Sequence, residues 1–304
     1  MKKVLVTGAA GSVGIQVIKY LLAEGKYEVT ALDLKNKVVF KKMRRFRKRI
    51  NILYGDVTDR VLIEALVKDH DVIIHLASSL PPLSDMKKGL AEIIDYDGSE
   101  NIIRAISYYN PKCHLFLAST TSLYKNIENP TVKSKIELDD YDYFSQAKYK
   151  AELLVKEKLK NYTIYRIPLV LGNPLVDPFM YNVKKSSIVG FVTKEDVAYA
   201  FVKGIKYLDK LNKKTYNVMS EETILFNDLL QKYLKICGLS WEYIFGRVLL
   251  EKDYYSPVCA DGELLNSVID YQTDSLALYF KRLSSKVRKR KVAKFLAKPL
   301  IKKN

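Results

Sequence analysis

Short apolar runs alternate with amphipathic segments along the first half of the chain. The runs that we expect to form strands span residues 2–7, 27–33, 50–54, 71–76, 114–118 and 162–166. Between them, apolar residues recur three and four positions apart, which is the spacing of one helix face. Nearly continuous apolar strands that alternate with helices are buried on both faces of a sheet. The pattern therefore predicts an α/β fold built on a doubly wound parallel sheet.

The second half of the chain is less regular. Here we expect strands at 187–192 and 215–219 and helices at 195–207 and 226–236. The chain has no internal repeat and no low-complexity linker, so we expect its parts to pack around one cleft. The predicted dinucleotide-binding domain spans residues 1–174, and residues 188–220 return to it. A smaller C-terminal substrate lobe is predicted over residues 175–187 and 221–280, followed by a basic tail over residues 281–304.

Three glycines spaced three residues apart follow the first strand, at Gly8, Gly11 and Gly14. Glycine lets the backbone turn sharply and approach a ligand closely. The helix that begins after them supplies unpaired N–H groups and a positive dipole end, which suit a pyrophosphate. Asp33 ends the second strand about twenty residues further on, where a carboxylate binds ribose hydroxyls and repels a 2′-phosphate. This predicts a Rossmann fold that binds NAD rather than NADP, although Lys35 and Lys37 lie close to Asp33.

Composition narrows the class of protein. A chain of 304 residues with 48% apolar and 28% charged residues is typical of a soluble globular protein. No stretch approaches the roughly 18 apolar residues of a membrane-spanning helix. The cysteines Cys113, Cys237 and Cys259 are odd in number and lack metal-ligand spacing. We therefore expect reduced thiols, a cytoplasmic location and no metal site.

The net charge of +17 is concentrated in two segments. Residues 35–49 carry nine basic residues at roughly helical apolar spacing, and residues 281–304 carry eleven; neither segment has an acidic residue. In the second segment Val292, Phe295 and Leu296 share one helical face among lysines, which is typical of an interfacial helix on an anionic membrane. A solvated basic tail is the alternative. Peripheral association with the inner membrane face is thus an open prediction, and no specific nucleic-acid partner is expected.

Several further motifs occur at the ends of the expected strands. In order, the motifs are Thr7-Gly8-x-x-Gly11-x-x-Gly14, Asp33, Gly55-Asp56-Val57-Thr58-Asp59, His75-Leu76-Ala77-Ser78, Gly98-Ser99-x-Asn101, Arg166-Ile167-Pro168 and Thr193-x-x-Asp196. Over residues 1 to about 280 the chain resembles the extended short-chain dehydrogenase/reductases, the group of NAD-dependent sugar-nucleotide epimerases and dehydratases. The resemblance implies that NAD is held by Gly8, Gly11, Ser12, Val13, Gly14, Asp33, Asp56, Val57, Leu76, Ala77, Ser78, Lys148 and Pro168. It also implies a nucleotide sugar as the substrate, and a homodimer is a further expectation.

Two motif residues need separate interpretation. Asp95 stands where the family's helix motif has its first Asn, which is a departure from the pattern. His75 ends a buried strand, where a hydrogen-bonded structural side chain is commoner than an acid or a base. We therefore expect no catalytic role for His75.

The family's chemistry needs a hydroxyl group, a tyrosine and a lysine. The resemblance places Thr120 at the hydroxyl position and Lys148 at the lysine position, where the ammonium group holds the ribose and lowers the pKa of a phenol four residues earlier. In this chain that earlier residue is Phe144, which has no proton to give. Tyr143 and Tyr141 lie close in sequence but at other angles around the helix.

Three interpretations of Phe144 stay open. In the first, an active enzyme transfers the proton through another group or a bound water. In the second, the chain is a catalytically impaired relative that binds NAD as a structural or sensing ligand. In the third, Phe144 is a deliberate Tyr-to-Phe substitution made to trap a complex. The leading prediction is an NAD-dependent epimerase, dehydratase or reductase that acts on a nucleotide-linked sugar.

Overall fold

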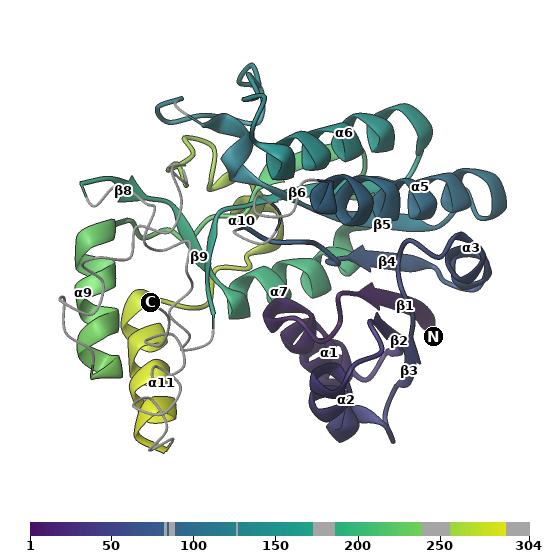
Figure 1. Ribbon diagram of the computed structural model, residues 1–304, viewed down its shortest axis with the longest axis horizontal. Coiled ribbons are helices and arrows are strands. Elements are labelled where there is room, and N and C mark those ends of the chain that lie inside the picture. The colour runs from purple at the N-terminus through teal and green to yellow at the C-terminus, as the bar shows by residue number, and fades with distance from the viewer. Residues whose placement is uncertain (82–83, 85–88, 126, 173–185, 239–255, 290–304) are drawn as a thin grey trace, which may run out of the picture.

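Seven parallel strands form one sheet in the computed structural model of the protein (Figure 1). The structure describes residues 1–81, 84, 89–125, 127–172, 186–238 and 256–289. The strands are β1 (Lys2–Thr7), β2 (Tyr27–Asp33), β3 (Asn51–Tyr54), β4 (Val72–His75), β5 (His114–Thr120), β6 (Tyr162–Ile167) and β10 (Lys214–Asn217). Across the sheet they follow the order β10-β6-β5-β4-β1-β2-β3, and every neighbouring pair is parallel. The predicted doubly wound sheet is confirmed, and the strand order reverses between β1 and β4.

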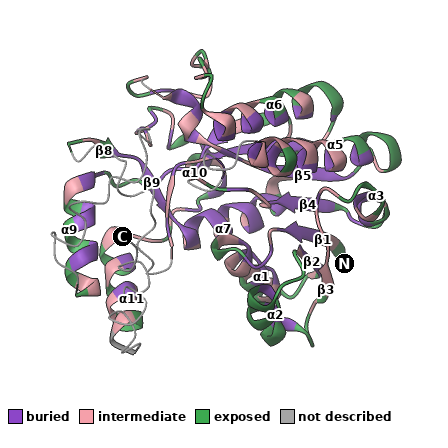
Figure 2. Ribbon diagram, viewed as in Figure 1, coloured by how far each residue is buried: buried purple, intermediate pink, exposed green. Residues whose placement is uncertain are grey.

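Helices cover both faces of the sheet because strand side chains alternate between the faces. One face is covered by α1 (Ser12–Glu24), α2 (Lys37–Met43) and α7 (Lys194–Gly204), and the other by α3 (Arg60–Lys68), α5 (Gly98–Tyr109) and α6 (Tyr143–Lys158). In β1, Val4 and Val6 join the first hydrophobic core and Leu5 joins the second. Figure 2 shows the strands buried, with the outer surfaces of the helices exposed. Burial on both faces explains the continuous apolar runs in the sequence.

Helix ends follow the capping residues of the sequence. Asn36, Asp59 and Thr193 cap α2, α3 and α7 through side-chain hydrogen bonds to backbone N–H groups. Gly25 and Gly238 end α1 and α9 (Phe226–Cys237) with positive φ angles of 65° and 69°. A glycine adopts this left-handed conformation without strain, so Gly25 and Gly238 allow the two helices to stop there.

Several expected helices are interrupted or shorter than predicted. Apolar spacing predicts one long helix over residues 86–109. The structure has a π-helical segment, Glu92–Asp97, directly before α5, and residues 85–88 lie outside the described part of the chain. The helices expected at 35–49 and 195–207 are α2 and α7, each followed by a short turn. The 3-10 turns are Arg44–Phe46, Thr121–Tyr124 and Ile205–Tyr207, and α8 (Leu208–Leu211) is a single turn.

The C-terminal part of the chain forms a smaller group of elements beside the sheet (Figure 1). Its elements are β7 (Leu169–Leu171), β8 (Ile188–Val189), β9 (Phe191–Thr193), β11 (Ile224–Leu225), α9, α10 (Leu264–Ile269) and α11 (Leu276–Lys289). β7 pairs with β9, and β8 pairs antiparallel with β11. Leu230, Tyr233, Tyr279 and Leu283 form the apolar core around α9 and α11. Residues 175–185 and 239–255 of the predicted lobe, and residues 173–174 before it, lie outside the described residues.

The strand expected over 187–192 is in fact two short strands, β8 and β9, separated at Gly190. The N–H of Gly190 donates to the carbonyl oxygen of Ser256 at 2.9 Å. A Cβ atom on Gly190 would lie 2.1 Å from the carbonyl oxygen of Pro257. A second backbone segment thus crosses in contact with Gly190, and this crossing divides the strand.

The boundary expected at residue 281 falls inside α11, which runs to Lys289. Leu283 is buried against α9, and Val287 packs on the same apolar cluster. The basic tail therefore begins as part of a packed helix, because an apolar face continues beneath its lysines. Residues 290–304, with the expected apolar face of Val292, Phe295 and Leu296, lie outside the described residues. None of the described helices is long and apolar enough to cross a membrane.

Candidate active site

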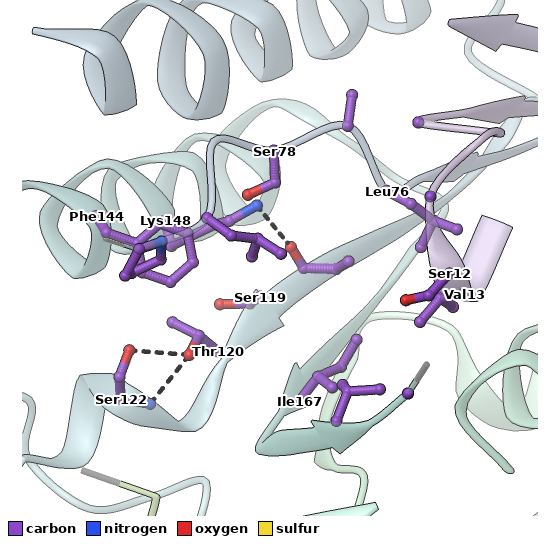
Figure 3. A pocket seen from close by; sticks show the side chains of 18 of the residues that line it. Ser12, Val13, Leu76, Ser78, Ser119, Thr120, Ser122, Phe144, Lys148 and Ile167 are labelled. Carbon is purple, nitrogen blue, oxygen red and sulfur yellow. Dashed lines mark hydrogen bonds between the residues drawn. The ribbon is translucent and has the colours of Figure 1, made fainter. Parts of the chain in front are cut away.

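A large cavity lies at the carboxyl ends of the strands, with a volume of about 1540 Å³. Its walls come from the segments that follow β1 to β6, and Tyr233 and Tyr279 contribute from the C-terminal lobe. Side chains from α1, the end of β5 and α6 face this space in Figure 3. All of the site residues expected from the sequence line it: Gly8, Gly11, Ser12, Val13, Gly14, Asp33, Asp56, Val57, Leu76, Ala77, Ser78, Thr120, Phe144, Lys148 and Pro168.

The glycine turn brings backbone N–H groups to the cavity. Gly8 has a φ of +63°, and a Cβ atom there would lie 2.7 Å from the backbone nitrogen of Ala77. The N–H of Gly11 donates to the carbonyl oxygen of Gly8 at 3.0 Å, and a Cβ atom on Gly14 would lie 2.5 Å from that oxygen. No side chain caps the start of α1. The first turn of α1 therefore offers N–H groups to an anion, and a pyrophosphate fits this place.

Asp33 both faces the cavity and holds the glycine turn. Its Oδ2 atom accepts from the N–H of Ala10 at 2.7 Å, and its Oδ1 atom accepts from the following backbone N–H at 2.8 Å. Each oxygen keeps a second lone pair with which it can accept a ribose hydroxyl. Lys42, which the sequence analysis missed, lines the same cavity and donates to the carbonyl oxygen of Ala10 at 3.0 Å. Lys35 and Lys37 are not among the described residues that line the cavity.

The loop that follows β3 is held by α5. Asp56 accepts the N–H of Thr58 on its Oδ1 atom at 3.0 Å. Asn101 donates to the carbonyl oxygens of Val57 and Thr58, each at 3.2 Å. Gly98 leaves room for Val57, because a Cβ atom on Gly98 would lie 2.6 Å from its Cγ2 atom. The motif that contains Gly98 and Asn101 therefore supports this wall of the cavity from the helix behind it.

His75 is a buried structural residue, as the sequence predicts. Its Nδ1 atom lies 2.7 Å from Oγ1 of Thr7, and its Nε2 atom lies 3.0 Å from Oγ of Ser99. Burial, together with the nearby charge of Lys148, lowers the pKa of His75 to about 3. The ring is thus neutral near pH 7, and it joins β1, β4 and α5 through its two hydrogen bonds.

Lys148 is buried in α6, and its ammonium group has two protein partners. The Nζ atom donates to the carbonyl oxygen of Ala118 at 3.1 Å (Figure 3) and forms an ion pair with Oδ1 of Asp95 at 2.9 Å. Asp95 is fully buried and accepts hydrogen bonds from Ser78 Oγ, from Ser79 N at 3.0 Å and from Ser79 Oγ at 2.6 Å. Burial alone raises the pKa of Asp95, but Lys148 and these hydrogen bonds outweigh it and hold the pKa below its usual range. Asp95 is therefore an ionised partner of Lys148, a role that the sequence analysis missed.

Phe144 lies one helical turn before Lys148 and lines the same cavity. The centroid of its buried ring is 5.8 Å from the Nζ atom of Lys148. Of the two nearby tyrosines, Tyr141 lines the cavity and is 74% exposed, whereas Tyr143 is not among the described residues that line it. Tyr141 is therefore the better candidate for a phenol that reaches a bound ligand.

Three hydroxyl groups form a chain beside Phe144. Oγ1 of Thr120 lies 2.8 Å from Oγ of Ser122 (Figure 3). Oγ of Ser122 lies 2.9 Å from Oγ of Ser145. Thr120 also accepts the N–H of Ser122 at 3.1 Å. Each hydroxyl can both donate and accept, so the three can reorient together when a ligand binds Thr120. The sequence pointed to Thr120, but the contribution of Ser145 depends on the packing of α6 against β5.

Arg166 and Glu152 form a buried bidentate ion pair that holds the frame of the site. The Nε and Nη2 atoms of Arg166 donate to the two carboxylate oxygens of Glu152 at 2.9 and 2.6 Å. Its Nη1 atom donates to the hydroxyl of Tyr124 at 2.9 Å, and that hydroxyl donates to Oδ1 of Asn217 at 2.9 Å. Burial raises the pKa of Glu152, but hydrogen bonding and attraction to Arg166 outweigh it and leave the pKa below its usual range. These bonds connect α6, β6 and β10. Pro168, which follows β6 in the chain, lines the cavity.

Cys113, Cys237 and Cys259 are free thiols in the structure. Within the described ranges, no group of three or more His, Cys, Asp or Glu side chains is placed to hold a metal ion. A doubly wound sheet with a glycine turn, an uncapped helix start and a carboxylate after β2 defines a Rossmann-type dinucleotide-binding fold.

The family follows from comparison with known proteins. The model of the NAD-dependent epimerase/dehydratase family matches residues 4–218, and the chain belongs to this family. NAD is therefore its cofactor, and the residues around the cavity suit that molecule. The expected resemblance to sugar-nucleotide epimerases and dehydratases is confirmed.

Individual relatives are enzymes of nucleotide sugars. Over 125 residues the chain is 32% identical to the UDP-N-acetyl-alpha-D-glucosaminuronate decarboxylase of Bacillus cytotoxicus, and this match covers 40% of the chain but only 38% of that protein. Over 235 residues it is 24% identical to the dTDP-glucose 4,6-dehydratase of Mycolicibacterium smegmatis, covering 73% of the chain and 70% of that protein. The solved structure of UDP-glucuronic acid 4-epimerase from Bacillus cereus, with UDP-glucuronic acid and NAD, shares the fold at a TM-score of 0.78 and 18% identity, covering 94% and 99% of the two chains.

Proposed function

We propose that the protein binds NAD together with a nucleotide-linked sugar and exchanges hydride between them. The shared cavity carries this proposal, because one space of about 1540 Å³ is bordered by the residues expected to hold NAD, from Gly8 to Ser78, and by Thr120 and Lys148. A site for one small ligand typically measures about 300–1,000 Å³, so this cavity has room for cofactor and substrate together. The names of the relatives specify UDP-linked and dTDP-linked sugars, which supports a substrate of this class.

The order of the strands orients the cofactor. The glycine turn after β1 binds the pyrophosphate. Asp33 and Asp56 follow β2 and β3 on one side of that turn, so the adenosine half lies over them. Thr120 and Lys148 lie on the opposite side, beyond β4, so the nicotinamide half extends toward them. Bound in this direction, NAD supplies a hydride acceptor or donor at the end of the cavity that holds Thr120.

Thr120 and Lys148 have separate roles in the proposal. The Oγ1 atom of Thr120, held by Ser122, binds the oxygen of the sugar carbon that exchanges hydride. Lys148 directs two of its three N–H groups to Ala118 and Asp95, which leaves one N–H for a ribose hydroxyl. Both residues therefore position the reactants at fixed places on the wall.

Proton transfer is the weak step, because residue 144 carries no phenol. Every alcohol that loses hydride also loses a proton. Here the proton can pass along the hydroxyls of Thr120, Ser122 and Ser145 or to Tyr141 at the exposed rim. Positioned proton transfer contributes about 10²–10⁴-fold to a rate, so we propose slow turnover by the unaltered chain.

The second candidate function is NAD binding without turnover, as a structural or sensing ligand. Phe144 favours it, because the ring lines the cavity without offering a proton. Asp95 also favours it, because it already pairs with Lys148 and makes that cation less available to a reacting group. Both candidates share the cofactor site and differ only in chemistry.

We also propose that the basic tail attaches the protein to an anionic membrane surface. The tail continues from α11, where Lys286 is exposed. Burial, Arg45 and Lys286 together lower the pKa of Lys19, so these three cations from different elements lie within electrostatic reach of one another. Anionic lipid headgroups relieve such repulsion, and the eleven basic residues of 281–304 extend the same charge.

The experiment for the main proposal uses purified full-length protein with NAD and a panel of UDP-linked and dTDP-linked sugars. Sugar products are separated by chromatography, and reduced cofactor is followed by its absorbance. NAD-dependent conversion of a sugar that is lost in Lys148→Met supports the enzymatic function. NAD binding with no conversion of any sugar supports the second candidate.

A further inference from the structure

Asp95 and Lys148 meet between the π-helical segment Glu92–Asp97 and α6, behind the cavity wall. Their ion pair of 2.9 Å is buried, with side chains that are 0% and 4% exposed. Ser78 lines the cavity and donates to Asp95, so only one layer of side chains separates the carboxylate from the space where a ligand binds. The partners of Asp95 all belong to the folded chain, and the pair therefore exists before any ligand enters.

Stability alone does not explain this pair. Removing two charges from water is costly, and a buried ion pair often stabilises a protein no better than apolar residues of similar size. Ser78 and Ser79 must supply three hydrogen bonds to keep the carboxylate ionised. The pair places at the cavity a lysine whose positive charge is cancelled by Asp95, which is fully buried and is not among the described residues that line the cavity.

The oxidised and reduced forms of the cofactor interact differently with a positive charge on Lys148. The nicotinamide ring of NAD⁺ carries a positive charge, and the ring of NADH, which has accepted a hydride, does not. In the orientation proposed above from the strand order, the nicotinamide half of the cofactor extends toward Lys148, which lines the cavity. An unpaired ammonium group there would repel the oxidised ring and leave the reduced ring unaffected, because like charges interact strongly in a protein interior.

We propose that Asp95 sets the oxidation state that the cavity prefers, because by neutralising Lys148 it lets the protein bind NAD⁺ tightly relative to NADH. The proposal deepens the proposed function at the same site and rests only on its cofactor half. Asp95 is thus a specificity-determining residue that acts through Lys148. A cavity that favours NAD⁺ makes transfer of hydride to the bound cofactor less favourable and the return of that hydride to the sugar more favourable.

The experiment measures the dissociation constants of NAD⁺ and NADH for the full chain at pH 7. NADH is followed by its fluorescence, and NAD⁺ by competition with NADH. The decisive quantity is the ratio of the NAD⁺ constant to the NADH constant, because damage that weakens both forms equally cancels in it. In Asp95→Asn this ratio should rise about tenfold, the change that about 1.4 kcal/mol produces.

Charge cancellation is tested by the double variant Asp95→Asn/Lys148→Met. Both charges are then absent, so the ratio should return to that of the unaltered protein. Ser79→Ala is the matched control, because it removes a side-chain hydrogen bond from the same carboxylate and leaves the charge in place. Its ratio should stay within about twofold of the unaltered value, since the ring still faces a neutral pair.

Three outcomes overturn the proposal. In Asp95→Asn, an unchanged ratio or an equal loss of affinity for both forms makes Asp95 a packing residue. A raised ratio that persists in the double variant means that Lys148 is not the group through which Asp95 acts. If Asp95→Asn does not fold, Lys148→Met carries the test: a ratio at or below the unaltered value supports the proposal, and a higher ratio overturns it. No sugar enters these measurements, so failure of the proposed turnover leaves their result intact.

Discussion

The ring centroid of Phe144 lies 5.8 Å from the Nζ atom of Lys148, one turn away on α6. Both side chains border the cavity, and the hydroxyl chain that begins at Thr120 lies beside them. An apolar ring thus occupies the place from which a phenol would reach both the ammonium group and a ligand.

Phe144→Tyr is expected to raise turnover of an accepted nucleotide sugar by about 10²–10⁴-fold, because it restores a positioned proton donor. Adding Lys148→Met should abolish the gain, because loss of the ammonium group leaves the new phenol beside the unpaired carboxylate of Asp95, which raises the pKa of the phenol. Steady-state rates of product formation measure both effects, with Phe144→Leu as the control for altered packing. If the unaltered chain already turns over at ordinary enzyme rates and Phe144→Tyr changes nothing, another residue moves the proton, and Tyr141→Phe is the next variant to measure.

The unaltered protein is expected to bind NAD(H) more tightly than NADP(H), because Asp33 stands where a 2′-phosphate would lie. Asp33→Asn should narrow the difference, since Lys42 then remains at this end of the cavity without the carboxylate. Calorimetry with both cofactors measures the change. Asp209→Asn, on the exposed start of α8, is the matched control for loss of one negative charge. Equal or tighter NADP(H) binding by the unaltered chain would show that Lys42 outweighs Asp33.

Glu152→Gln is expected to lower the free energy of unfolding at pH 7 by about 3–5 kcal/mol, because it leaves Arg166 as an uncompensated buried charge. Glu92→Gln breaks the exposed pair with Lys150 and should cost less than about 1 kcal/mol. Urea denaturation of the two variants makes the comparison. Equal losses in the two variants would contradict the role of burial.

The Glu152–Arg166 pair also predicts a pH dependence. The folded protein holds the pKa of Glu152 below its ordinary value of 4.5, so on acidification the unfolded chain takes up this proton first. The stabilisation is complete above the unfolded pKa and is lost as the pH falls from there through the folded pKa. The stability difference between the unaltered chain and Glu152→Gln should therefore shrink on acidification below about pH 4.5. A difference that stays constant with pH would argue against the ion pair as its source.

Removal of residues 290–304 is expected to abolish most binding to vesicles that contain phosphatidylglycerol, because each basic residue at such a surface contributes about 1 kcal/mol. The melting temperature should stay unchanged. Truncation after Leu283 should lower it, because Val287 packs on the cluster around α9 and α11. Co-sedimentation measures binding, with neutral phosphatidylcholine vesicles as the control. Equal sedimentation of the truncated and full chains would contradict attachment through the tail.

The sheet and the residues that we expect to hold NAD could be predicted from the sequence because they depend on residues close together in the chain. Gly8 adopts a φ of +63°, and Gly14 touches the carbonyl oxygen of Gly8 where no Cβ atom fits, so both positions require glycine. Asp33 could be assigned because the alternation of apolar strand and helix shows where β2 ends. Each of these features depends on residues close in the chain, and periodicity reveals such residues directly.

Contacts between distant segments were not predictable in the same way. The pair of Asp95 and Lys148 forms only when the π-helical segment packs on α6. Gly190 divides a strand because the backbone at Pro257 crosses it. The packing of Leu283 and Val287 on α9 was not predicted, because the charge of residues 281–304 obscured the helical spacing of these two side chains. The homodimer stays a prediction.

The edge strand β10 joins β6 only after the chain has left the sheet and formed β7, β8, β9 and α7. The sheet is therefore not encoded by one uninterrupted stretch of the gene. A polypeptide that stops at residue 172 lacks both this edge strand and α7, a helix that covers one face. The remainder lacks the six strands on which those elements rest. If the gene were split between codons 172 and 186, we expect two fragments that fold only when they associate. NAD binding would then measure the association of the two fragments in a cell.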